Sequence, residues 1–159
     1  MKHPAPSAHR KRTRAKPLPQ YGALPYRLAP DRLASGPEIL LVTSRDTGRW
    51  VIPKGWPIPA KSRRKVAALE AMEEAGVEGR IAREPLGEFD YLKGLKSGES
   101  QACRVTVFAL EVTAQRDEWR ERAERATQWF GWEAAAAAVQ EPGLRQIILD
   151  FARRLTGEA

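Results

Sequence analysis

The sequence predicts an α+β domain in which a mixed β-sheet is sandwiched between helices. Short apolar segments typical of strands occur along most of the chain. One helical segment with clear start and stop signals lies among them, and an amphipathic helical segment closes the sequence. Strands that precede and surround a few helices indicate this class. The length of 159 residues suits one domain with a sizeable core.

The strands are expected where apolar runs are bounded by turn residues, at 21–28, 38–43, 49–52, 77–92, 101–112 and 128–132. The helices are expected at 62–75, 133–139 and 142–155. Turns or loops are expected at 32–37, 44–48 and 93–100, and a short helix or irregular arm at 117–126. The segment Pro53–Pro57 is expected to be a loop, because its prolines and glycine disfavour both helix and strand pairing.

Positive charge is concentrated at the amino-terminal end. Residues 1–16 hold six basic side chains and no acidic one; the rest of the chain holds 21 basic and 20 acidic residues. Six of the seven net positive charges therefore belong to this segment. We expect a disordered basic tail over residues 1–19 and one folded domain over residues 20–159. The tail could contact RNA or another acidic surface, but its composition favours a solvated extension.

The sequence also limits which cellular compartment and which catalytic mechanisms are expected. No apolar stretch approaches the roughly 20 residues needed to span a membrane, and no apolar run follows the basic start. A single cysteine, Cys103, excludes an internal disulfide framework and fits a buried strand position in a cytoplasmic protein. Both histidines, His3 and His9, lie in the tail, so the folded part cannot use a Ser-His or Cys-His mechanism.

The helix expected at 62–75 begins at an N-cap serine, Ser62, and ends before Gly76. Its core-facing stripe is expected to consist of Ala68, Ala71, Met72 and Ala75.

Three carboxylates are expected on the opposite side of this helix. Glu70, Glu73 and Glu74 are spaced i, i+3 and i+4, within one helical turn, and no lysine follows Glu70 at i+4 to relieve their repulsion. Grouped carboxylates favour a magnesium site, since Mg²⁺ takes one or two carboxylates, several waters and substrate phosphates. Taken alone, such a run is more often the solvated acidic face of a surface helix.

The spacing around these acids is more specific. Gly55 is followed after five residues by Lys61 and after seven more by Leu69-Glu70-Ala71-Met72-Glu73-Glu74-Ala75-Gly76-Val77. This resembles the Nudix box, Gly-x5-Glu-x7-Arg-Glu-U-x-Glu-Glu-x-Gly-U with U aliphatic, at every position except two and without a gap. The resemblance covers about residues 20–155. Arg49-Trp50, Pro53-Lys54-Gly55, Asp117–Trp119 and Gln128-Trp129-Phe130 are similar to the diphosphoinositol polyphosphate phosphohydrolase branch.

The resemblance implies a Nudix-type α/β/α sandwich and magnesium-dependent hydrolysis of a pyrophosphate bond, with manganese as the alternative metal. It implies catalytic roles for Glu70, Glu73 and Glu74, and metal binding by these side chains and the Gly55 carbonyl. The substrate would be a small polyphosphate: a nucleoside diphosphate-linked compound, a dinucleoside polyphosphate or a diphosphoinositol polyphosphate. Candidate phosphate-binding cations are Arg45, Arg49, Lys54, Lys93, Lys96 and Arg125.

Two departures from the box leave alternatives open. Lys61 replaces the first box glutamate, and Leu69 replaces the arginine that in the family orients the helix carboxylates. Arg63 is a hypothetical substitute for that arginine. A weakened Nudix domain that only binds a phosphorylated ligand or RNA is the second reading, and an acidic interaction surface the third. Trp56 could stack on a base or inositol ring, or pack over its own loop.

Overall fold

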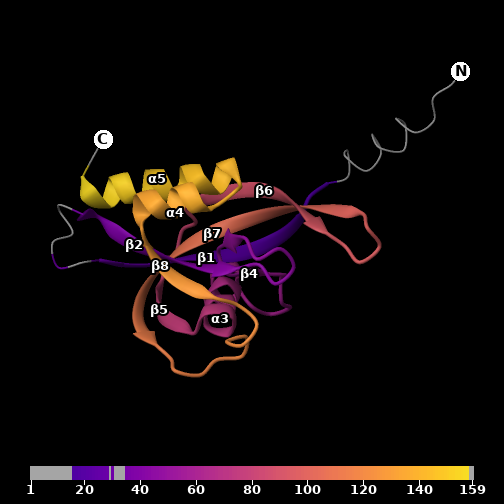
Figure 1. Cartoon of the computed structure of the whole chain (residues 1–159), viewed down its shortest axis with the longest axis horizontal. Coiled ribbons are helices and arrows are strands. Elements are labelled where there is room, and N and C mark those ends of the chain that lie inside the picture. Colours follow the sequence, from indigo (N-terminus) through magenta and orange to yellow (C-terminus); the bar gives the residue numbers. More distant parts are fainter. Residues whose placement is uncertain (1–15, 29, 31–34, 158–159) are drawn as a thin grey trace, which may run out of the picture.

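A computed structural model describes residues 16–28, 30 and 35–157. Its strands are β1 (Leu18–Leu28), β2 (Pro37–Thr43), β3 (Trp50–Val51), β4 (Lys54–Gly55), β5 (Val77–Ile81), β6 (Gly87–Gly94), β7 (Ser100–Gln115) and β8 (Thr127–Gly131). Its helices are α3 (Arg63–Ala75), α4 (Trp132–Ala138) and α5 (Pro142–Thr156). Figure 1 shows α4 and α5 on one side of the sheet and α3 on the other, which confirms the predicted α+β sandwich.

The amino-terminal strand β1 occupies the centre of the sheet. The strand order is β3-β2-β1-β7-β5, with β4 paired to β1, β6 to β7 and β8 to β2. The β1–β7 pair is parallel, from Leu18 opposite Cys103 to Tyr26 opposite Glu111, whereas β1 pairs with β2 and β4 antiparallel. The sheet is therefore mixed, as predicted.

Each face of the sheet has its own core. Because side chains alternate along a strand, Ala23 and Leu24 of β1 point to opposite faces. Leu24 packs in the core under α4 and α5, together with Ile148 of α5. Ala23 packs in the core under α3, together with Phe108 of β7.

Several boundaries differ from the prediction. Lys54 and Gly55 form a two-residue strand paired with Gly22 and Tyr21, so the expectation of an unpaired loop at 53–57 was wrong. Strand pairing survives here because neither residue is a proline and the flanking prolines lie outside the pair. The strand expected at 77–92 is two strands, β5 and β6, separated by residues 82–86.

The expected domain boundary and two connecting segments can also be placed. Strand β1 begins two residues before the expected domain start. Residues 1–15 of the expected tail and residues 32–34 of the turn expected at 32–37 lie outside the described residues. The arm at 117–126 has turns and no helix.

The caps of α3 are confirmed, but its faces differ from the prediction. The Ser62 hydroxyl accepts a hydrogen bond from the Lys65 amide, and Gly76 adopts the left-handed conformation at φ 71°. The buried residues of the helix are Val66, Ala67, Ala71, Glu74 and Ala75, whereas Ala68 and Met72 are only half-buried. Glu74 follows Ala71 by three positions, which places the two side chains roughly 60° apart around the helix. The acids therefore adjoin the buried face rather than oppose it.

Candidate active site

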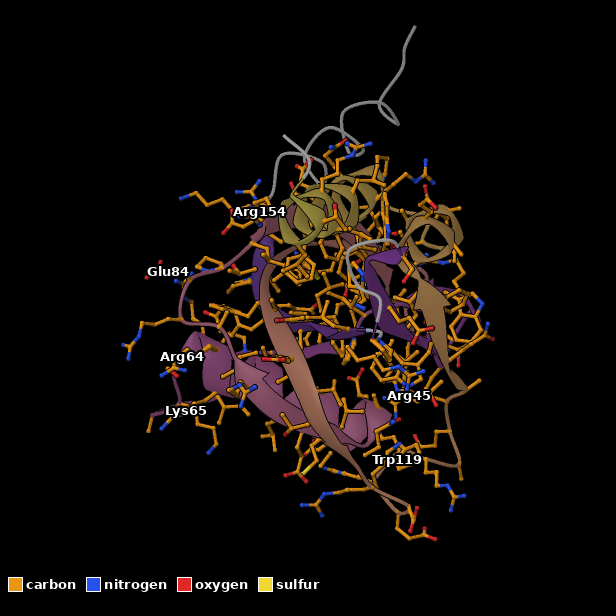
Figure 2. All side chains as sticks on the ribbon, turned by 90° about the vertical axis from the view of Figure 1, so that its left-hand side faces the viewer. Arg45, Arg64, Lys65, Glu84, Trp119 and Arg154 are labelled. Carbon is orange, nitrogen blue, oxygen red and sulfur yellow. The ribbon has the colours of Figure 1, made fainter. Side chains whose placement is uncertain are left out.

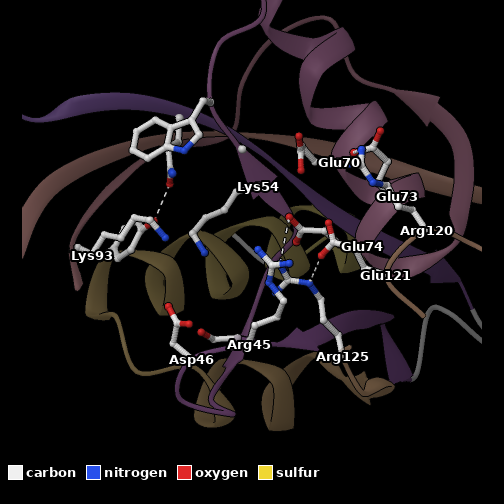
Figure 3. Close-up of a pocket in the computed structure, with 15 residues that line it drawn as sticks. Arg45, Asp46, Lys54, Glu70, Glu73, Glu74, Lys93, Arg120, Glu121 and Arg125 are labelled. Atoms are coloured by element: carbon white, nitrogen blue, oxygen red, sulfur yellow. Dashed lines mark hydrogen bonds and ion pairs between the residues drawn. The ribbon is translucent and has the colours of Figure 1, made fainter. Parts of the chain in front are cut away.

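A cavity of about 350 Å³ opens where the carboxyl-terminal half of α3 meets β4, β6, the turn after β2 and the segment 116–126. Figure 3 shows the glutamates of α3 on one side, with Lys54, Lys93 and Arg45 across from them. Its charged lining residues are five acids (Asp46, Glu70, Glu73, Glu74, Glu121) and five bases (Arg45, Lys54, Lys93, Arg120, Arg125). The three glutamates of the predicted motif thus face one charged pocket.

Glu70 and Glu74 form a close carboxyl pair beside the backbone of Gly55. Their side chains hydrogen-bond each other. A methyl group at Gly55 would collide with the Glu70 carboxylate, so only glycine permits this approach. Burial raises the pKa of Glu74 to about 8, against the opposing effect of Arg125, and burial also raises the pKa of Glu70. At Glu74 the effect of burial therefore outweighs that of Arg125.

Arg125 is the most firmly held cation near this pair. Its guanidinium donates to Glu121 at 2.7 Å and to the Thr43 carbonyl at 3.0 Å, and Nη2 lies 3.6 Å from Glu74 Oε2. The side chains of Arg125 and Glu74 are only 10% and 7% exposed. A neighbouring residue, Arg120, places Nη1 3.6 Å from Glu73 Oε1.

The cations beside the helix acids thus come from the segment 116–126. In the Nudix box this positive charge would come from an arginine at the position of Leu69. The substitute suggested at Arg63 was wrong, because its guanidinium lies over the Phe108 ring at 5.6 Å. Arg64 and Lys65, also at the start of α3, project from the side of the molecule opposite to Arg45 (Figure 2).

The segment 116–126 is attached at both ends. The Arg116 amide donates to the Gly76 carbonyl at 2.8 Å, and the Glu121 amide donates to the Glu73 carbonyl at 2.9 Å. At the other end, the Ala126 amide donates to Thr43 Oγ1 at 2.9 Å. These bonds join the end of α3 to β2 and hold Arg120 and Arg125 at the pocket.

Four of the six predicted phosphate-binding cations line the pocket: Arg45, Lys54, Lys93 and Arg125. Lys54 Nζ lies 4.9 Å from the centre of the Tyr91 ring, and burial lowers the pKa of this lysine. Arg45 pairs with Glu124 at 2.7 Å.

The other two predicted cations, Arg49 and Lys96, are not brought into the pocket. Arg49 pairs with Glu141, at the start of α5, at 3.2 Å. Lys96 is exposed in the turn between β6 and β7, which projects away from the body of the protein (Figure 1). Both residues were predicted at the pocket because they lie close to pocket residues in the sequence. Closeness in sequence does not reveal how far β6 and β7 extend or which layer Arg49 faces.

The pocket also contains residues that sequence reasoning missed: Gln20, Ser44, Asp46, Tyr91, Arg120 and Glu121. Asp46 adjoins a predicted residue, Arg45, and could have been included on that ground. Arg120 and Glu121 lie in a charged segment without helical or strand periodicity, so no pattern indicated which side chains would turn inward.

The donor set fits a magnesium ion in part. Among the described residues, no three acidic, histidine or cysteine side chains are arranged to hold a metal by themselves. Mg²⁺ usually takes only one or two carboxylates and fills its remaining positions with water and phosphate oxygens. The Glu70–Glu74 pair supplies two carboxylates and suits that requirement, whereas Glu73 lies beside Arg120.

Known proteins that resemble this chain include Nudix hydrolases. No protein-family model matches the chain. Nudix hydrolase 13, mitochondrial, of Arabidopsis thaliana is 27% identical over 150 residues, which are 86% of this chain and 74% of that protein. Diphosphoinositol polyphosphate phosphohydrolase 3-alpha of Mus musculus is 34% identical over 106 residues, 65% of this chain; the chain thus spans 60% of that relative's length.

Solved structures show the same fold at low sequence identity. A C. elegans Ap4A hydrolase binary complex has a TM-score of 0.63 at 20% identity, covering 88% of this chain and 98% of that one. The NUDIX domain of Shewanella oneidensis NrtR complexed with ADP ribose has a TM-score of 0.64 at 16% identity, covering 91% and 92%. These likenesses confirm the predicted Nudix-type sandwich. With the relatives above, they support the Nudix family that the box indicated.

Proposed function

We propose that this chain hydrolyses a pyrophosphate bond of a small polyphosphate substrate with the help of magnesium. The observation that carries the proposal is the pair of half-buried Glu70 and buried Glu74 beside the Gly55 backbone, facing the cations of the pocket. The substrate classes are a nucleoside diphosphate-linked compound, a dinucleoside polyphosphate and a diphosphoinositol polyphosphate. Manganese is the alternative metal.

In this proposal each wall of the pocket has a distinct role. Glu70, Glu74 and the Gly55 carbonyl would hold the magnesium ion, which neutralises phosphate charge and lowers the pKa of bound water. Lys54 and Lys93 would bind the phosphate oxygens from the opposite wall.

The remaining step is activation of water. Glu70 is the first candidate for orienting and deprotonating the attacking water, because its carboxylate lies against the Gly55 backbone at the pocket. Glu73 is the alternative base, but its carboxylate is already paired with Arg120, whose Nη1 lies 3.6 Å away.

The test is a phosphate-release assay over compounds of the three substrate classes, with magnesium and again with excess chelator. Glu74→Gln serves as the blank, because it removes one carboxylate of the pair and keeps the side-chain size. Chelator-sensitive turnover that is absent from this variant supports the proposal. No turnover of any compound would contradict it.

A second candidate is a Nudix domain that binds a phosphorylated ligand without hydrolysing it. It is favoured by Leu69 and Lys61 in the box. Melting experiments would separate the two: magnesium that raises the melting temperature without any turnover supports the binding domain.

A cytoplasmic location, expected from the cysteine content, also belongs to this proposal. The two first plant relatives carry the word mitochondrial in their names, so imaging of a tagged chain is the test. No helix among the described residues has the length and apolarity to cross a membrane.

A further inference from the structure

Trp56 is an uncovered aromatic ring at the edge of the pocket. Its side chain lines the cavity and is 43% exposed, whereas the other four tryptophans are half-buried. Trp50, for example, packs edge-to-face against Phe130 at 5.1 Å. Packing over its own loop was one of the two roles considered for Trp56. Such packing leaves much of the ring in solvent, where a ligand can contact it.

The backbone around Trp56 is held in place. The preceding residue, Gly55, pairs with Tyr21 of β1, and the Ala23 amide donates to the Pro53 carbonyl at 3.0 Å. The next residue is a proline, Pro57, whose ring restricts the backbone further. A ring presented by a restrained backbone loses little conformational entropy when a ligand stacks on it.

The ring also lies close to the proposed reaction centre. Gly55 contacts the Glu70 carboxylate, and the Cα atom of Trp56 is one residue away, about 3.8 Å along the chain. The other aromatic side chain of the pocket, Tyr91, is already engaged, since Lys54 covers its ring and its hydroxyl donates to Gln20 at 2.7 Å.

The charges of the pocket favour a substrate with a short phosphate chain. Its five basic side chains are balanced by five acidic ones, and Arg45, Arg120 and Arg125 all pair with carboxylates. Of the five, Lys54 and Lys93 form no ion pair with any described carboxylate. A diphosphoinositol polyphosphate carries phosphates around its whole ring and needs many more cations. It also has no flat aromatic face.

We propose that Trp56 is a stacking platform for the base of a nucleoside polyphosphate, and that it makes this site select such substrates over diphosphoinositol polyphosphates. The inference rests on the proposed hydrolytic site, because it places the phosphate chain between the Glu70–Glu74 pair and the two unpaired lysines.

The experiment compares diadenosine tetraphosphate with a diphosphoinositol pentakisphosphate as substrates of the 159-residue chain. The variants are Trp56→Ala, Trp56→Phe and a control of similar exposure outside the pocket, Leu18→Ala, whose native side chain is 45% exposed. Each is measured for kcat and KM with magnesium, and for ADP binding by calorimetry with calcium in place of magnesium.

Loss of one base–aromatic stack corresponds to roughly a 5- to 150-fold change. We expect Trp56→Ala to raise KM for diadenosine tetraphosphate and weaken ADP binding within that range, with kcat nearly unchanged. Trp56→Phe should stay within a few-fold of the native chain. KM for the diphosphoinositol compound should not respond to either substitution.

The proposed stacking role would be refuted if the Trp56 substitutions changed KM equally for both substrates or for neither. A native chain that prefers the diphosphoinositol compound would refute it as well. Turnover that does not depend on Trp56 would leave the hydrolase proposal standing without it. ADP binding that depends on Trp56 in a chain without turnover would support the platform and refute the hydrolase instead.

Discussion

Replacing Glu74 with glutamine should stabilise the metal-free protein while abolishing metal-dependent turnover. Glu74 is 5% exposed, and its pKa is raised from 4.5 to about 8. A carboxyl group with a raised pKa holds its proton in the folded protein at pH values where the unfolded chain has lost it. The free energy of unfolding is therefore highest below pH 4.5 and falls as the pH rises to about 8.

The shift sets the magnitude of this effect. Each pH unit between the two pKa values lowers the free energy of unfolding by up to about 1.4 kcal/mol. The loss at pH 7 therefore reaches about 3 kcal/mol. This is an upper limit, because Glu70 shares the titration. Glutamine cannot ionise and avoids the penalty. For a domain of this size the gain corresponds to a rise in melting temperature of up to roughly 10 °C.

The assay is thermal unfolding with chelator from pH 5.5 to 8.5, for the native chain, Glu74→Gln and the control Glu84→Gln, which lies outside the pocket. The advantage of Glu74→Gln should widen as the pH rises, and magnesium at pH 8 should stabilise the native chain more than this variant. A pH-independent difference, or a native chain that is more stable than Glu74→Gln at pH 8, would refute the reasoning.

Three further changes test the surroundings of the pair. Arg125→Met should lower kcat/KM about 10- to 100-fold, because it removes the cation beside Glu74; the control Arg122→Met, whose native side chain pairs with Glu118 at 3.0 Å, should have little effect in the same kinetic assay. Leu69→Arg should change kcat/KM less than about three-fold, because cations already flank the acids; a larger gain would show that the carboxylates still lack orientation. Deleting residues 1–16 should leave KM for small substrates unchanged, and a large rise would place the tail at the site.

Sequence patterns predicted the parts of the fold that depend on residues close together in the chain. The caps of α3 were predictable because a serine and a glycine have specific conformational roles at helix ends. The buried strand β2 was predictable from its continuous apolar run. The pairing of Lys54 and Gly55 with β1 was not predictable, because it depends on a strand more than 30 residues earlier in the chain.

The same distinction applies to the site. Glu70, Glu73 and Glu74 share one helix, so helical geometry alone predicted that they lie together. The burial of Glu74 was not expected, because the stripe was assigned to Ala68 and Met72 instead of Val66 and Ala67. The partners in the segment 116–126 were missed as a group, since tertiary hydrogen bonds position them rather than any periodic pattern.

The central position of β1 has a consequence for folding. This strand pairs in parallel with β7, so each residue of β1 is synthesised 85 positions before its partner, as for Leu18 and Cys103. Sheets that depend on such distant pairings assemble slowly, because the chain between the strands must lose entropy before the stabilising contacts can form. A nascent chain that ends after the box helix would hold all three glutamates but would lack β7 and Arg125. We therefore expect the pocket to form only late in synthesis, when the second half of the sheet has closed on β1.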